Sequence, residues 1–164
     1  MAGFVYVIYT DFSSANEPAE TEEPMETEEV EDSEEEEPIL LDGPRDDELN
    51  PFNTEIKQEE MTESTIRDYI HKMSHQKIHA EEKWGLIEIT DERVEWLLES
   101  VDKTKEQIEH KDVYTKILTR WADGDFSQAV EDHNTIWTMQ GGNIGKALRL
   151  LTEDEEAAYL ESKR

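Results

Sequence analysis

The sequence predicts an all-α domain, a compact array of about five to six short amphipathic helices, after a disordered acidic N-terminal segment. After Pro51 the apolar residues recur at helical spacing, and no segment shows the sustained alternation of a strand between hairpin turns. Before Pro51 lie 18 acidic residues and one basic residue, a composition too polar to offset the entropy lost on folding. We therefore expect an apolar stub at 1–12, a disordered acidic tether at 13–50 and a helical domain at 51–164.

The first predicted helix begins after Thr62, a residue type that caps helix N-termini well. Its apolar positions recur at i, i+3, i+4 and i+7: Ile66, Tyr69, Ile70 and Met73. The same stripe continues through Ala80 to Trp84. The helix is therefore expected to end only at Gly85, which is a stop signal.

Five further helical segments follow along the chain. Thr90 can cap the second, and its apolar positions are Val94, Leu97, Leu98 and Val101. The third begins near Asp112 and is expected to bury Tyr114, Ile117, Leu118 and Trp121. The fourth opens at Ser127, and its apolar face carries Phe126, Val130, His133, Ile136 and Trp137. A short helix is expected over Ile144, Leu148 and Leu151, and Thr152 with Glu155 forms the capping box of a last one.

Charge and composition exclude several classes of function. The chain has 43 acidic and 16 basic residues, a net charge of -27, so it repels phosphate backbones and we expect no nucleic-acid partner. It has no cysteine, which excludes disulfides, thiolate metal sites and cysteine nucleophiles. We expect no cofactor, and we expect a protein partner that the sequence does not identify. The charge also suggests an acidic nucleic-acid mimic. A mimic should hold its carboxylates on a rigid fold, whereas much of the acidic excess here lies in the expected disordered tether.

Two apolar segments interrupt the polar N-terminal part. Residues 4–9 (FVYVIY) resemble the last two turns of a transmembrane helix, with tyrosines suited to the interface. The alternative is a disordered or loosely strand-like terminus. No Lys or Arg precedes Arg45, as is typical of the outer side of a membrane. The island at 39–41 (ILL) could dock on the domain or on a partner, although a solvated island is favoured.

Six separated blocks of the domain resemble an uncharacterised family of short proteins from Gram-positive bacteria. In chain order they are 73–77 (MSHQK), 82–85 (EKWG), Thr90 with Arg93, 117–127 (ILTRWADGDFS), 133–137 (HNTIW) and 140–142 (QGG). The resemblance covers about residues 50–155 and implies no activity. It implies an extracytoplasmic domain tethered to a membrane by an N-terminal helix, of which the apolar stub would be a truncated remnant.

The histidines are the candidate metal ligands. His71, His75 and His79 are spaced i, i+4 and i+8, so neighbouring pairs on a continuous helix could chelate a divalent metal. They fall opposite the apolar stripe, and the favoured interpretation is therefore a solvated polar face. His133 lies on the apolar face of its helix. It could be a general base, but a buried, hydrogen-bonded structural imidazole is favoured.

The candidate binding residues are Trp96, His133, Asn134 and Trp137. Trp96 projects away from the apolar face of its helix, so it marks either an interface or a helix buried on two sides. We assign no catalytic residue. The favoured function is a non-enzymatic, extracytoplasmic interaction domain tethered to a cell membrane. The alternative is a metal-binding or hydrolytic helical protein that uses His71, His75 and His133.

Overall fold

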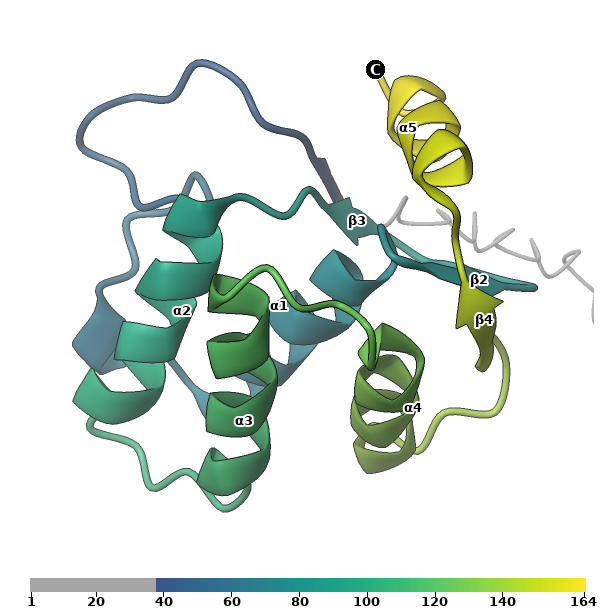
Figure 1. Ribbon diagram of the computed structural model, residues 1–164. Helices are drawn as coiled ribbons and strands as arrows, with labels where there is room; N and C mark the ends of the chain where they lie inside the picture. The colour runs from purple at the N-terminus through teal and green to yellow at the C-terminus, as the bar shows by residue number, and fades with distance from the viewer. Residues whose placement is uncertain (1–37) are drawn as a thin grey trace, which may run out of the picture. The chain divides into compact units, whose positions relative to one another are not determined.

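The structure is a computed structural model that describes residues 38–164 (Figure 1). The apolar stub and residues 13–37 of the expected tether lie outside the described residues. The described part is mainly helical but not purely all-α, because short strands join the helices. Its helices are α1 (Glu63–Ser74), α2 (Asp91–Lys103), α3 (Lys111–Ala122), α4 (Ala129–Met139) and α5 (Glu153–Glu161), with a 3-10 turn η1 (Gln58–Glu60). Its strands are β1 (Ile39–Leu40), β2 (Ile78–Ala80), β3 (Leu86–Ile87) and β4 (Ala147–Leu150).

The predicted N-terminal caps are confirmed. The side chain of Thr62 accepts a hydrogen bond from the amide of Thr65 at the start of α1. Thr90 caps α2 in the same way, and Thr152 forms the predicted capping box with Glu155 at the start of α5. Each cap is a local signal, because donor and acceptor lie within three residues of one another.

The predicted continuation of the first helix to Gly85 is wrong, because α1 ends at Ser74 and the chain then forms a turn and strand β2. The polar side chains of this turn are used by distant partners. Gln76 is buried. Its side chain accepts a hydrogen bond from the amide of Ile89 at 2.7 Å and donates one to the carboxylate of Glu156 at 2.6 Å. Since these bonds join three separate segments, tertiary contacts override the helical pattern here.

A strand also replaces the short helix expected over residues 144–151. Strand β4 pairs antiparallel with β2, so that Ile78 lies opposite Leu150. The side chain of Asn134, on α4, accepts the amide of Ala147 at 2.8 Å and donates to its carbonyl at 3.0 Å. The Asn134 side chain thus binds both backbone groups of Ala147, the first residue of β4, as a neighbouring strand would. These two bonds hold the segment extended.

The segment before Pro51 docks on the domain, against the favoured expectation of a solvated island. Strand β1 pairs parallel with β3, and Leu40 packs on the core. The buried guanidinium of Arg93 donates to the backbone carbonyls of residues 40, 41, 51 and 88. The folded domain therefore includes residues from about 38 onward, and not only those after Pro51.

The main core joins α1, α2, α3 and α4, with α3 beside α2 and α4 beside α1 (Figure 1). A second, smaller cluster packs β2 and β4 against the start of α4. Trp121 and Tyr114 of α3 are its largest buried side chains. Trp96 is half-buried and meets the ring of Phe52 edge-on at 5.6 Å between ring centroids. Trp96 thus packs against the core on one side while part of its side chain stays exposed, so α2 is buried on two sides and the binding role predicted for Trp96 stays a prediction. No helix in the described part of the chain is both long and apolar enough to cross a membrane.

Glu63, the first residue of α1, binds the start of α3. Its carboxylate accepts hydrogen bonds from the Glu109 amide at 2.8 Å, from the amide and ring of His110, and from the Tyr114 hydroxyl at 2.9 Å. Burial raises the pKa of Glu63, but these hydrogen bonds outweigh it and lower the pKa from 4.5 to about 2. The charged carboxylate therefore stabilises the folded state.

We expect Glu63→Gln to lower the free energy of unfolding at pH 7 by about 1–3 kcal/mol, because the amide cannot accept the same set of hydrogen bonds. The folded-state pKa is depressed, so the contribution is complete above about pH 4.5 and is lost as the pH falls towards about 2. Urea unfolding at several pH values measures this, with exposed Glu95→Gln as the control. A difference between variant and wild type that grew on acidification would contradict the assignment.

Candidate metal centre

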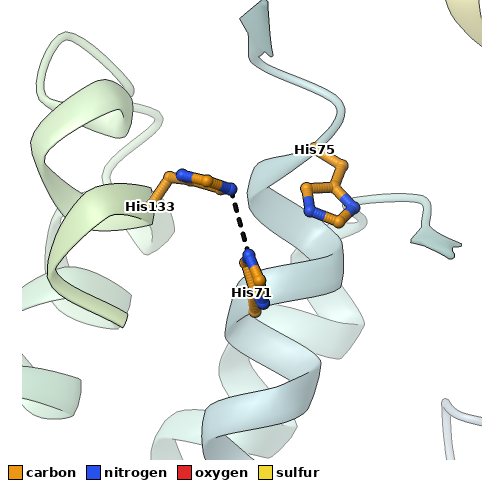
Figure 2. Close-up of side chains that lie close together, drawn as sticks. All are labelled: His71, His75 and His133. Carbon is orange, nitrogen blue, oxygen red and sulfur yellow. Dashed lines mark hydrogen bonds between the residues drawn. The ribbon is translucent and has the colours of Figure 1, made fainter. Parts of the chain in front are cut away.

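Three histidines from two helices meet on one side of the core. His71 lies on α1, His75 directly follows the last residue of α1, and His133 lies on α4. The Nε2 atoms of His71 and His133 are 3.0 Å apart, although the two residues are 62 positions apart in the sequence. One ring nitrogen from each histidine falls within a group whose members all lie within 4.8 Å of one another. Figure 2 shows the rings of His71 and His133 pointing towards each other, with His75 beside them.

The burial of this cluster corrects the expected solvated stripe. His133 is 0% exposed and His75 is 3% exposed, while His71 is half-buried. Because α1 ends at Ser74, His79 is separated from the other two and lies exposed on strand β2. His133 is buried as expected for a structural imidazole, but its nearest polar neighbours include a second histidine.

Hydrogen bonds fix the tautomers of two of the three rings. His75 Nδ1 donates to the carbonyl of Gly85 at 2.8 Å, and His133 Nδ1 donates to Oδ1 of Asn134 at 3.2 Å. The Asn134 orientation is set by its two bonds to Ala147, so its oxygen can only accept from His133. A neutral imidazole carries one N–H, so the Nε2 atoms of both rings are bare acceptors.

The environment keeps all three rings neutral. Burial lowers the pKa of His75 to about 3. Burial, followed by the nearby His133 ring, lowers the pKa of His71 to about 4. Burial also lowers the pKa of His133. Neutral imidazole is the form that binds metal ions, so the three rings are ready ligands at neutral pH.

His71 is the ring whose tautomer can change. Its ring also hydrogen-bonds the side chain of Gln140, at the end of α4. A carboxamide offers both a donor and an acceptor, so Gln140 can support either tautomer of His71. With the proton on Nε2, His71 donates to His133. With the proton on Nδ1, His71 also has a bare Nε2, so each of the three rings can offer an unprotonated nitrogen to a shared ion.

The ligand set and its spacing suit a divalent transition metal. Imidazole nitrogens suit zinc, copper, nickel and iron, and a tetrahedral ion bound at about 2.0–2.1 Å holds its ligand nitrogens about 3.3 Å apart. The 3.0 Å between His71 and His133 is close to that spacing. Other separations in the group reach up to 4.8 Å, so the His75 ring must move closer to the other two when an ion binds. A backbone carbonyl on the outer nitrogen, as Gly85 provides for His75, is typical of metal-binding histidines.

A cleft of about 280 Å³ adjoins the cluster. His71 and His75 lie in its wall, and the loop from Gln140 to Gly145 forms another part of it. Trp137, one of the predicted binding residues, also lines the cleft and donates its Nε1 hydrogen to the carbonyl of Ile144 at 2.7 Å. The cluster is therefore reached from solvent on the side of His71 and His75.

The structure brings some predicted site residues together and separates others. His71, His75, His133, Asn134 and Trp137 all belong to this region, whereas His79 and Trp96 do not. Sequence reasoning did not assign a role to Gln140 or to the Gly85 carbonyl. Both lie within the blocks of the family resemblance, but nothing in their local pattern points to a histidine.

Comparison with known proteins gives a family but no activity. Residues 70–161 match a family described as a family of unknown function, DUF6241. The matched segment includes the three histidines, Asn134 and Gln140. No curated protein and no solved structure matches the chain.

Proposed function

The chain belongs to the DUF6241 family of unknown function, and we propose that its domain binds a divalent transition metal ion, of the zinc class, through His71, His75 and His133. The observation that carries this proposal is the convergence of three buried, neutral imidazoles within 4.8 Å of one another. The Nδ1 atoms of His75 and His133 are held by Gly85 and Asn134, so the other nitrogen of each ring is left for a shared ion. Zinc is the probe ion of choice because it binds imidazole tetrahedrally without redox chemistry.

Titration calorimetry with zinc at neutral pH tests the proposal. We expect one ion per chain with micromolar or tighter affinity, and we expect the double variant His71→Gln/His75→Gln to lose the site. His79→Gln is the matched control, since His79 is exposed on β2, outside the cluster, and should leave the affinity unchanged. Asn134→Ala is expected to weaken binding about 10–100-fold through the orientation of His133.

Thermal stability provides a second measurement on the same proteins. Zinc at 100 times its dissociation constant stabilises the native state by about 2.7 kcal/mol, since the free energy added is RT ln(1 + [L]/Kd). The melting temperature of the wild type should rise with zinc, and that of the double variant should not. Zinc binding of equal strength in the wild type and the double variant would refute the assignment.

The tethered, extracytoplasmic interaction role is our second candidate, and its support comes from the sequence. An apolar stretch at 4–9 precedes a long acidic segment that has no basic residue before Arg45. This order is typical of a domain held outside a membrane, and the Gram-positive family resemblance agrees with it. Protease treatment of intact cells that produce the protein tests this. Degradation without lysis is expected, and protection until lysis would contradict the role.

A further inference from the structure

The position of the cleft relative to the three histidines has a chemical consequence. His133 is fully buried on one side, while His71 and His75 line the cleft on the other. We propose that the bound metal keeps an exchangeable coordination position facing this cleft. Water fills the position, and an oxygen-donor ligand with an aromatic group replaces it. This inference rests on the metal-binding function proposed above.

The number of protein ligands is the first support. In the part of the chain that the structure describes, the group able to share an ion consists of these three histidines, with no carboxylate among them. Zinc sites with four protein ligands are closed and structural, whereas sites with three leave a position for water or substrate. A water molecule takes up about 30 Å³ in the liquid, so the cleft of 280 Å³ has room for several waters or one small ligand.

The aromatic walls of the cleft are the second support. Trp84 lines the cleft and is 57% exposed, which is unusual for so large an apolar side chain. Trp137 forms a fixed wall. Its Nε1 is bound to the Ile144 carbonyl, and a Cβ added at Gly142 would lie 2.3 Å from its ring. An aromatic group on a ligand could pack against these walls while its oxygen reaches the metal.

The charges around the cleft and the charge of the ion together decide which oxygen donors fit. Asp68 and Glu82 line the cleft, and the cation in its wall, Lys72, is paired with Asp68 at 3.0 Å. A divalent ion outweighs the net negative charge of these side chains, so the site accepts neutral donors such as amides and esters and also a hydroxamic acid, which loses its proton to solvent as it binds the metal. Such carbonyl compounds are the ligands that a metal ion polarises as a Lewis acid, so the same position would suit hydrolysis of an amide or ester.

Hydroxamic acids added to the cobalt(II)-loaded protein test this inference. Cobalt(II) absorbs visible light with an intensity that depends on coordination number, so a ligand that binds the metal changes the spectrum. We expect benzohydroxamic acid to change it and to bind about three- to tenfold more tightly than acetohydroxamic acid, which lacks the ring. Trp84→Ala should remove most of this difference. Leu148→Ala, an exposed apolar residue outside the cleft wall, should retain it.

The outcomes separate this inference from the metal-binding function. Failure of cobalt and zinc to bind the wild type would overturn both. Tight metal binding with a spectrum that neither hydroxamic acid changes would leave the metal site standing and overturn the exchangeable position. Spectral changes of equal affinity for both acids, unaffected by Trp84→Ala, would overturn the aromatic specificity of the cleft.

Discussion

Trp121→Ala is expected to lower the free energy of unfolding by about 3–5 kcal/mol, the usual cost of truncating a buried tryptophan. The Trp121 side chain is 2% exposed, and its Nε1 donates to Oδ2 of Asp132 at 3.2 Å. The buried Asp132 carboxylate also binds Arg120. The substitution therefore leaves a cavity and removes one of the donors that compensate a buried charge. The total free energy of unfolding of a domain of this size is about 5–15 kcal/mol, so the variant should be close to unfolding.

Urea unfolding followed by circular dichroism measures the effect of this substitution. Trp137→Ala is the matched control, because it removes the same kind of side chain from a position that is only half-buried, at the cleft. We expect it to cost about 1–2 kcal/mol, less than a fully buried tryptophan. Equal losses for the two variants would mean that the core is not centred on α3.

Arg93→Ala should destabilise the domain by about 3 kcal/mol or more and release the N-terminal strand. The guanidinium donates to four backbone carbonyls, including 2.6 Å to Glu88 and 2.9 Å to Pro51. Hydrogen bonds to a charged group contribute about 1.5–3 kcal/mol each to stability. Removal of the guanidinium would also leave buried carbonyl oxygens without a hydrogen-bond donor. Strand β1 is only two residues long, so its pairing with β3 depends on this contact.

Amide hydrogen exchange distinguishes release of the strand from general unfolding. The amides of Leu86 and Glu88 donate to the carbonyls of Pro38 and Leu40, so they should exchange faster in the variant than amides of α3. Arg45→Ala is the control. Arg45 forms an exposed ion pair with Glu92 and should contribute less than about 1 kcal/mol. Unchanged protection of Leu86 and Glu88 in the Arg93 variant would show that the strand holds without it.

Local signals in the sequence predicted much of this fold, and distant contacts account for what it did not predict. Thr62, Thr90 and Thr152 identify helix starts, since capping involves residues three apart. The apolar periodicity through Trp84 was misleading, because the turn after Ser74 is held by bonds to segments far along the chain. Local sequence propensity does not depend on such distant partners, so it could not indicate this turn. For the same reason the sequence did not predict strand β4.

The candidate site was predictable in part. The i, i+4 spacing of His71 and His75 is visible in the sequence, and it identified them as possible ligands. His133 was recognised as buried because it lies on the apolar face of α4. Its meeting with His71 depends on the packing of α1 against α4, and no local pattern contains that packing.

If the proposed metal centre forms, the pairing of α1 with α4 would also make it a reporter of the folded chain. In the denatured chain His71 and His75 remain close neighbours, whereas His133 must be brought across a loop of 62 residues. Closing that loop costs roughly 2 kcal/mol more than closing the short one, by the logarithmic dependence of chain entropy on length. Unfolded molecules therefore offer an ion at most a weak two-nitrogen site. Metal added during refolding would bind late, after the non-local contacts have formed. The rate of metal uptake would therefore report when the tertiary structure is complete.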